Sequence, residues 1–494
     1  MNQYPALIVI APLLSALVVA IGGWFNRRIY FPVAVAALGV SVCSALGLLI
    51  QVMATGPFSY RLGGWMPPFG IEYYIDYLSA LVLLLMTSIG LLNLIATRRD
   101  VERTYEGKVP VFYTLYLLSV VGHLGLVVTG DAFNLYVLLE ITALSGYALL
   151  AMGDAKSALS TLRYLFMGTM GASFYLLGVG FLYIMTGSLN MQDLASILPN
   201  LYTNPAIIAA FGLIMAGVFT KMAFFPMHAW LPNAYGDAGS PASSLIAPMT
   251  TKVMVYVMIR MMLTVFTPDF VFASAVFNEA IVWLAIIAML AGAAFALAQR
   301  DLKRMLTFVL LSEVGYMVGG AWLGNRLGMT GSILHIVNDA AMTLCVFLCA
   351  GCIKYRNQST RFENLPGLFR KQPFTMTALV IGALAMIGVP PTCGFFSKWY
   401  LILGGLDAGH YWFVGALILS SLINIVLFFR VFEIAHFEPF TEGHGHGHHD
   451  KIHDAPWSMV VPLLVVAAGL IVLGFLSGDI VTHVIDFAIP ANIV

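Results

Sequence analysis

The stretch Phe219-Thr-Lys-Met-Ala-Phe-Phe-Pro-Met-His-Ala-Trp-Leu-Pro232 determines the fold that this sequence predicts. Lys221 lies near the end of an apolar segment that begins around Ala206, and Pro226 follows five residues later. An ionisable side chain at membrane depth costs about 2.5–3.5 kcal/mol on insertion scales, so it persists where it meets a partner or lines water. A helix broken there must turn its freed backbone groups toward protein or water. A buried lysine beside a broken helix therefore predicts an ion-handling centre within a membrane.

The composition places the rest of the chain in the same class. Of the 494 residues, 60% are hydrophobic and 10% are charged, whereas a soluble domain carries about 25% charged residues. This difference predicts an all-α polytopic membrane protein. The formal net charge is zero, which gives no reason to expect a nucleic-acid partner. Cys345, Cys349 and Cys352 share one helical face and are interpreted as packing residues, so no metal site is predicted from them.

Fourteen transmembrane helices are predicted, because the chain contains fourteen apolar stretches of about 20 residues, the length that crosses a bilayer. The stretches are 4–24, 30–52, 75–97, 110–129, 132–152, 158–186, 205–225, 242–266, 279–298, 302–323, 328–352, 374–404, 410–433 and 457–477. Short loops join most of them. No soluble domain fits between them, so residues 1–494 are predicted to form a single membrane domain.

The distribution of Lys and Arg supports this count, because cytoplasmic loops collect basic residues. The odd-numbered connections between spans hold seventeen of them, and the even-numbered connections hold only Arg61 and Arg326. The protein is predicted to be a multi-pass protein of a prokaryotic inner membrane, and the Lys/Arg pattern places both termini outside the cytoplasm. The N-terminus has no basic region or obvious cleavage site, so the first span is expected to be retained.

Two predicted spans are interrupted, the one at 205–225 and the one at 374–404. The second break reads Ile387-Gly-Val-Pro-Pro-Thr-Cys-Gly394, and its Pro and Gly residues stop a helix and let it restart. Broken helices at corresponding positions of two halves indicate a transporter site. Residues 110–266 and 279–433 each form a five-helix unit with the break in the fourth helix. Because five is odd, the second unit is predicted to be inverted relative to the first.

The remaining segments complete the predicted organisation. Residues 1–109 hold the first three spans, and their Gly- and Pro-rich loop at 58–74 is expected to form a hairpin on the outer face. Residues 434–456 form a cytoplasmic loop whose segment Glu442-Gly-His-Gly-His-Gly-His-His449 is His-rich. Such tracts can hold metal, but the segment is interpreted as a flexible Gly/His loop and no metal site is predicted. Residues 457–494 contain the last span and the tail.

Buried ionisable residues define the candidate site. Glu140 lies in the middle of its span, and its natural partner is Lys221. Lysine suits a proton relay because a nearby carboxylate can switch it between charged and neutral forms, whereas arginine stays protonated. A static buried salt bridge is the alternative, and three lysines on three helices favour the relay. Arg260 lies near the outer end of its span and is expected to reach the surface.

A second polar stripe lies on the span at 328–352. His335, Asp339 and Thr343 recur at every fourth residue and therefore share one face of the helix, which favours a water-lined path. Together with the lysines they predict a line of titratable groups near the middle of the membrane. The predicted proton-transfer residues are Glu140, Lys221, Lys252, His335, Asp339 and Lys398, and the secondary candidates are His228, Glu313, Tyr256, Thr343, Asp131 and Asp76. No cofactor is predicted.

Several short motifs in this order and spacing carry a family resemblance. They are Tyr74-Ile-Asp-Tyr-Leu-Ser-Ala80, Thr129-Gly-Asp-Ala-Phe-Asn-Leu-Tyr136 ahead of Glu140, Lys221 before Phe225-Pro226, Trp230-Leu-Pro232, Lys252 with Val255-Tyr256 and Arg260, and Gly388-Val-Pro-Pro before Gly394 and Lys398. The chain resembles the antiporter-like subunits shared by respiratory complex I and the multisubunit Mrp-type sodium/proton antiporters, above all the Mrp D subunit. The resemblance implies that Glu140 and Lys221 form a coupling pair, that Lys252 passes protons laterally and that Lys398 is the terminal group. It also implies that the chain works only inside a larger membrane complex.

The chain departs from that family pattern at its centre. Asp339 and Thr343 stand where relatives usually have a second His and a Lys, and Glu313 stands where relatives often have Gln or His. These changes shift the local charge from +1 towards −1. We therefore hypothesise that the central relay uses carboxylates or binds a cation.

The sequence thus predicts a proton-translocating subunit of a multisubunit sodium/proton antiporter. Its expected partners are other membrane subunits, the lipid bilayer, protons and, for an antiporter, sodium. The alternative is a proton-pumping subunit of a complex-I-like or hydrogenase-type redox complex. In that case any redox centre would belong to its partners, because no Cys or His cluster in this chain would hold one. A structural membrane anchor with fixed ion pairs is the remaining alternative.

Overall fold

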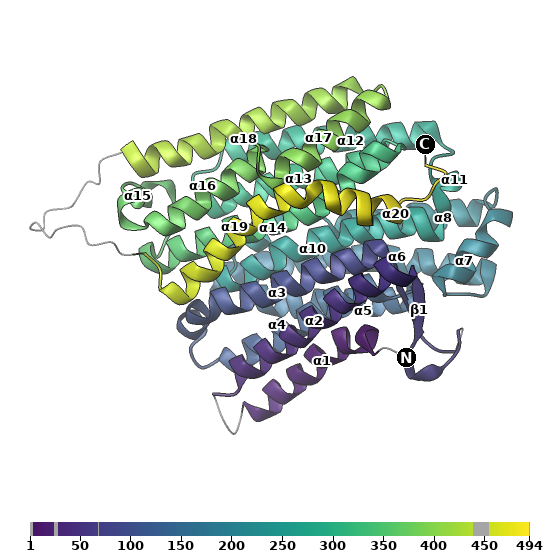
Figure 1. Ribbon diagram of the computed structural model, residues 1–494, viewed down its shortest axis with the longest axis horizontal. Coiled ribbons are helices and arrows are strands. Elements are labelled where there is room, and N and C mark those ends of the chain that lie inside the picture. The colour runs from purple at the N-terminus through teal and green to yellow at the C-terminus, as the bar shows by residue number, and fades with distance from the viewer. Residues whose placement is uncertain (1–2, 24–27, 68, 438–453, 494) are drawn as a thin grey trace, which may run out of the picture.

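The computed structural model describes residues 3–23, 28–67, 69–437 and 454–493. Figure 1 shows long helices running alongside one another from one end of the bundle to the other. The longer helices are α1 (Tyr4–Gly22), α2 (Tyr30–Thr55), α3 (Tyr77–Thr104), α4 (Val109–Val128), α5 (Ala132–Ala151), α6 (Ala155–Thr186), α8 (Pro205–Lys221), α10 (Ser240–Arg260), α12 (Ala275–Leu297), α13 (Leu302–Trp322), α14 (Arg326–Asn357), α16 (Pro373–Ile387), α17 (Cys393–Asp407), α18 (Tyr411–Phe437) and α19 (Trp457–Ile480).

Short elements connect these helices. They are α7 (Met191–Ile197), α9 (Leu231–Asp237), α11 (Thr267–Val271), α15 (Leu368–Lys371) and α20 (Asp486–Ala488), with the tighter or wider turns η1 (Leu62–Gly64), η2 (Leu198–Asn200), η3 (Met261–Val265), η4 (Phe362–Asn364) and η5 (Val481–Ile485). β1 (Phe58–Arg61) pairs antiparallel with β2 (Glu72–Ile75), in register from Phe58 opposite Ile75 to Arg61 opposite Glu72. The hairpin expected in this loop is therefore confirmed.

The chain is a multi-pass, all-helical membrane protein. Within the described residues, twelve helices are long and apolar enough to cross a membrane, and α8 and α16 are apolar but shorter. With 17 and 15 residues and a rise of about 1.5 Å per residue, these two fall short of the ~30 Å hydrocarbon core. Both are short because they end at the predicted breaks. The count of fourteen spans and the inverted relation of the two units stay predictions.

Both breaks coincide with helix ends whose carbonyl groups find polar partners. α8 ends at Lys221, and the indole Nε1 of Trp230 donates to the Thr220 carbonyl at 3.0 Å. α16 ends at Ile387, where Gly388 adopts φ 93°, a conformation that glycine reaches at no steric cost. The ammonium group of Lys398 donates to the Met386 carbonyl at 2.6 Å. The backbone groups freed by each break are thus satisfied by protein, as a membrane interior requires.

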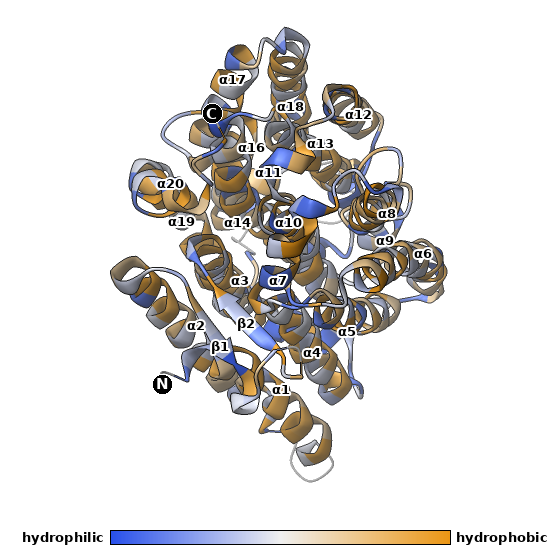
Figure 2. Ribbon diagram, turned by 90° about the vertical axis from the view of Figure 1, so that its right-hand side faces the viewer, coloured by the Kyte–Doolittle hydropathy of each residue, from blue (hydrophilic) through white to orange (hydrophobic). Residues whose placement is uncertain are grey.

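The helices divide into a lipid-facing rim and a covered centre. Figure 2, an end-on view, places α10 and α14 among the other helices and α1, α2, α6, α12 and α18 at the periphery. The apolar part of α10 is 100% buried and those of α13 and α14 are 94% buried, against 39% for α1, α2 and α6. Since α10, α13 and α14 carry Lys252, Glu313, His335 and Asp339, these polar residues lie where no lipid reaches them. Residues 438–453, with the predicted His-rich segment, lie outside the described residues.

Candidate functional site

The centre of the bundle holds an ion pair between α10 and α14. The ammonium nitrogen of Lys252 lies 2.9 Å from Oδ2 of Asp339, and both side chains are 0% exposed. Thr343 bridges the pair, because its hydroxyl accepts from Lys252 at 3.1 Å and donates to Oδ1 of Asp339 at 2.9 Å. Asp339 and Thr343 can share one partner because they lie one helical turn apart. The structure therefore brings the predicted polar stripe of α14 directly against Lys252.

One turn earlier on α14, a second polar group joins α13, α14 and α17. The ring of His335 contacts Oε2 of Glu313 through Nε2 at 2.7 Å and the Ser397 hydroxyl through Nδ1 at 2.8 Å. Glu313 and His335 are 0% exposed. The other carboxylate oxygen of Glu313 has no hydrogen-bond partner within the described chain. Ser397 was not predicted as a site residue, although its position next to Lys398 at the second break was a signal for it.

Lys398 extends this group toward the side of the bundle. Besides the Met386 carbonyl, it donates to the Ser421 hydroxyl at 3.2 Å, and its ammonium nitrogen lies 4.9 Å from the centre of the Tyr316 ring. The same ring lies 5.6 Å from that of His335. Lys398 also lines an open groove of about 310 Å³ between α17 and α18. The predicted residues on α14 and α17 are therefore neighbours, with Tyr316 between them.

The structure shows no direct contact between Glu140 and Lys221 within the described residues, and their functional pairing stays a prediction. Lys221 is buried and donates to the hydroxyl of Tyr147 at 3.5 Å. Glu140 is half-buried, and no ion pair within the described part of the chain joins it to Lys221. Tyr147 lies two turns after Glu140 on α5 and occupies the place beside Lys221. This spacing of seven residues was the available signal for Tyr147.

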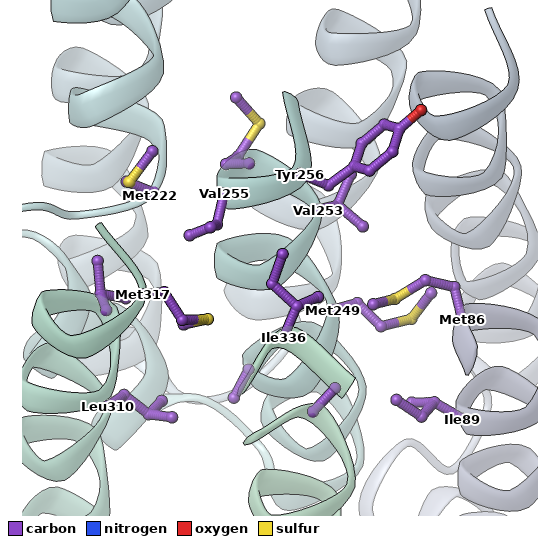
Figure 3. Close-up of a cluster of buried hydrophobic side chains, with 14 of the residues drawn as sticks. Met86, Ile89, Met222, Met249, Val253, Val255, Tyr256, Leu310, Met317 and Ile336 are labelled. Carbon is purple, nitrogen blue, oxygen red and sulfur yellow. The ribbon is translucent and has the colours of Figure 1, made fainter. Parts of the chain in front are cut away.

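Apolar side chains adjoin Lys221 and Lys252 along their helices. Figure 3 shows Met222, Met249, Val255 and Met317 in a cluster of buried hydrophobic residues among α8, α10 and α13. Within the described residues, no hydrogen bond or ion pair joins Lys221 to Lys252. The polar contacts of the second half form two separate groups, one around Asp339 and one around His335, so the predicted line of titratable groups stays a prediction.

The remaining secondary candidates have local structural contacts. Asp131 caps α5 by accepting from the Asn134 backbone N–H at 2.6 Å. His228 lies in the first break, where its ring stacks on Phe225 with 5.2 Å between the ring centres.

Arg260 does not reach the surface as expected, because a partner distant in sequence holds it inside. It is 4% exposed and donates to both oxygens of Asp76, at 2.6 and 2.8 Å. The hydroxyl of Tyr256 accepts from Arg260 and donates to the Val127 carbonyl at 2.7 Å. Burial acts to raise the pKa of Asp76, but Arg260 and the hydrogen bonds from Ser79 hold that pKa below its usual value. Asp76 and Tyr256 thus clamp the end of α10 to α3 and α4.

Asp76→Asn is expected to lower the free energy of unfolding by about 1.5–3 kcal/mol, the contribution of a hydrogen bond to a charged group. Because the native pKa of Asp76 lies below its unfolded value, its contribution is present above the unfolded pKa and is lost as the pH falls through the native one. Thermal unfolding in detergent at several pH values measures this difference. Glu102→Gln is the control, since its pair with Arg98 is about half exposed and such pairs contribute 0–1 kcal/mol. Equal losses for the two variants would contradict the prediction.

A bundle of membrane-crossing helices with two interrupted helices and buried ion pairs at its centre has the architecture of polytopic membrane transport proteins. A family model described as "NADH:quinone oxidoreductase/Mrp antiporter, TM" matches residues 129–424, which include both breaks and the central polar groups. The chain belongs to this family. The family predicted from the sequence motifs is therefore confirmed.

Known relatives resemble the chain along most of its length. It is 41% identical over 497 residues to an NADH-quinone oxidoreductase subunit N of Desulforudis audaxviator, covering 98% of each chain. It is 29% identical over 437 residues to the D-type member of a Na(+)/H(+) antiporter of Bacillus subtilis, covering 87% of this chain and 86% of that one. Among solved structures, a chain of the membrane-bound sulfane sulfur reductase, an archaeal respiratory membrane complex, matches with a TM-score of 0.89, 28% identity and 98% coverage of this chain and 97% of the other. These relatives are subunits of multisubunit membrane complexes.

Proposed function

We propose that this chain conducts protons within a multisubunit membrane complex, through Lys252, Asp339, His335, Glu313 and Lys398. The observation that supports this most is the presence of two fully buried polar groups on α10, α13, α14 and α17, one formed by Lys252, Asp339 and Thr343 and the other by Glu313, His335 and Ser397. Proton transfer needs heavy-atom distances of about 2.6–3.2 Å or one bridging water. The contacts of 2.7, 2.8 and 2.9 Å made by His335 and by the Lys252 pair meet this requirement.

Lys221 and Glu140 also belong to the proposed path, but protons would pass between them and the central groups only through water. No hydrogen bond or ion pair of the described chain joins Lys221 to Lys252, so protons would cross between them only through water. A half-buried Glu140 can exchange protons with its surroundings and influence Lys221 through space. The coupling pair implied by the family resemblance would thus act across Tyr147 rather than by direct contact.

The energy source of the complex is the second part of the proposal. The greater identity and coverage with the NADH-quinone oxidoreductase subunit N relative support a redox-driven complex, in which partner subunits would carry the electrons. The similarity to the Bacillus subtilis antiporter chain supports a sodium/proton antiporter as second candidate. Inverted membrane vesicles that contain the complex separate these candidates. Acidification that requires an electron donor fits the first, and sodium-dependent loss of an imposed proton gradient without a donor fits the second.

The basic residues support a location in the prokaryotic inner membrane with both termini outside the cytoplasm. Lys156 and Arg304, from two different odd-numbered connections, both pair with Asp237, at 3.0 and 2.8 Å. These connections therefore meet at one end of the bundle, as cytoplasmic loops would. The N- and C-terminal ends of the described chain both lie at the end of the bundle opposite the last turn of α18 and the first turn of α19 (Figure 1).

Lys398→Ala tests conduction against a purely structural role. The rate of proton uptake is expected to fall roughly 10-fold, below the usual effect of a proton-transfer group, because water in the adjoining groove can partly replace the ammonium group. Fluorescence quenching of a pH-sensitive dye in vesicles measures the rate, and a native gel measures the assembled complex. Lys156→Ala, which removes an exposed lysine, serves as control. An unchanged rate in Lys398→Ala, or a loss proportional to the loss of complex, would favour the structural anchor.

A further inference from the structure

A small cavity lies between the ends of α3 and α14 and the beginning of α10, at the end of the bundle predicted to face the cytoplasm. Its lining includes Thr97, Asp100, Ser240, Ser244 and Phe347, and its volume is about 10 Å³, measured as the space open to the centre of a water molecule. A cavity needs about 10–15 Å³ by this measure to hold one water. The cavity therefore has room for a single water molecule.

We propose that this cavity is a proton-access site, in which Asp100 exchanges protons with the cytoplasm and one bound water passes them toward Lys252. The proposal rests on the proposed function and extends its path to one face of the membrane. It assigns a role to Asp100 and Ser240, neither of which the sequence singled out.

The side chains of the cavity are suited to hold water and to take up a proton. Asp100 is 7% exposed, its Oδ1 accepts from the Thr104 hydroxyl at 2.9 Å, and no ion pair within the described residues includes it. Ser240 is also 7% exposed, and its hydroxyl has no hydrogen-bond partner in the described part of the chain. Leaving a buried hydroxyl unpaired costs about 1–3 kcal/mol. A water between Asp100 and Ser240 would remove that cost and connect the two side chains.

The route from the cavity to Lys252 follows α10. Ser240 and Ser244 share one face of this helix, and Lys252 lies about two turns beyond Ser244. Pro248 lies between them and has no backbone N–H, which leaves the carbonyl of Ser244 without its usual helical partner. The ammonium group of Lys252 bends back toward the cavity, donating to the Ala247 carbonyl at 3.4 Å. The carbonyls of Ser244 and Ala247 are therefore acceptors between the cavity and the central ion pair.

α14 forms the opposite wall of this route. Phe347 and Gly351 line the cavity, and Thr343, one turn before Phe347, contacts Lys252. Phe347 is thus the apolar side chain on that face between the cavity and the ion pair. Water must pass this ring to complete the connection.

Several charged groups lie near Asp100, and they define the alternative in which Asp100 has only a structural role. Lys354 on α14, Lys303 on α13 and Arg103 on its own helix act on its carboxylate through space, and Thr104 is its hydrogen-bonding neighbour. If Asp100 only balanced these cations, its removal would lower stability without changing the proton dependence of the rate. If Asp100 is an access group, its removal should instead raise the apparent KM for protons.

The test uses the whole complex in proteoliposomes with Asp100→Asn, Asp100→Glu and Ser240→Ala. Proton uptake is measured while the pH is varied on the face that carries the end of α3. In Asp100→Asn we expect a rate lower by about 10-fold at alkaline pH, less than the usual effect of a proton-transfer group, because the water of the cavity can still accept protons. The rate should approach that of the wild type when this face is acidified, so that the apparent KM for protons rises while kcat is kept. Asp100→Glu should restore the profile, and Ser240→Ala should show the same change more weakly.

Glu102→Gln, an exposed acid two residues away on α3, is the matched control and should leave the profile unchanged. A wild-type profile in Asp100→Asn together with a slow Lys398→Ala variant would overturn the access site and leave the proposed function standing. Wild-type rates in both variants would overturn both. A loss in Asp100→Asn that is equal at every pH, parallels the loss of assembled complex and is not restored by Asp100→Glu would assign Asp100 a structural role and overturn the proposal.

Discussion

Lys252→Met is expected to slow proton movement by about 10³-fold, within the range for loss of a proton-transfer group. It should also lower the free energy of unfolding by about 3–5 kcal/mol, because it leaves the fully buried charge of Asp339 without a partner. Uptake in proteoliposomes measures the first effect, and thermal unfolding of the purified complex measures the second. Both effects arise from one contact, so the single variant alone does not separate them.

A second variant, Lys252→Met combined with Asp339→Leu, separates stability from conduction. Replacing both members of a buried ion pair by apolar residues of similar size is often neutral or stabilising. Thr343 can then donate to the backbone carbonyl of residue 339, as Ser and Thr commonly do within helices. The double variant should therefore unfold near the wild-type temperature and still fail to conduct. A stable double variant that conducts at the wild-type rate would show that the pair is only structural.

Local chemistry explains which parts of the fold the sequence predicted. Pro226 and the Gly388-Val-Pro-Pro run end α8 and α16 through backbone effects that act within a few residues, so both breaks were predictable. The stripe of His335, Asp339 and Thr343 was predictable because helical periodicity fixes which residues share a face. The family followed from the same motifs.

Contacts between helices explain what the sequence could not provide. Glu140 and Tyr147 share one face of α5, so the height at which α8 packs along α5 decides that Tyr147, and not Glu140, lies beside Lys221. Arg260 pairs with Asp76, which lies 184 residues away in the sequence. The residues around Arg260 therefore do not identify this partner. The cavity at Asp100 likewise depends on three helices meeting. Pairing of charged residues in a membrane bundle is thus set by packing, while their presence is set by sequence.

The second large effect is expected for Glu313→Gln, which should slow proton movement by about 10²-fold. The glutamine keeps the size of the side chain and a polar atom for the 2.7 Å contact with His335, so the free energy of unfolding should change by no more than about 1 kcal/mol. What the substitution removes is the capacity of residue 313 to bind and release a proton next to the imidazole. The initial rate of uptake in vesicles, normalised to the assembled complex, measures the effect.

Glu279→Gln is the matched control. Glu279 lies on the neighbouring helix α12, its side chain is 49% exposed, and it is not one of the residues of the proposed path. A slow Glu313→Gln complex beside a normal Glu279→Gln complex would mean that the carboxylate introduced on α13 takes part in conduction. A wild-type rate in Glu313→Gln would remove the hypothesis that the centre of this chain relies on carboxylates. In that case His335 would hold a static hydrogen bond, and the path would have to pass from Asp339 to Lys398 through water alone.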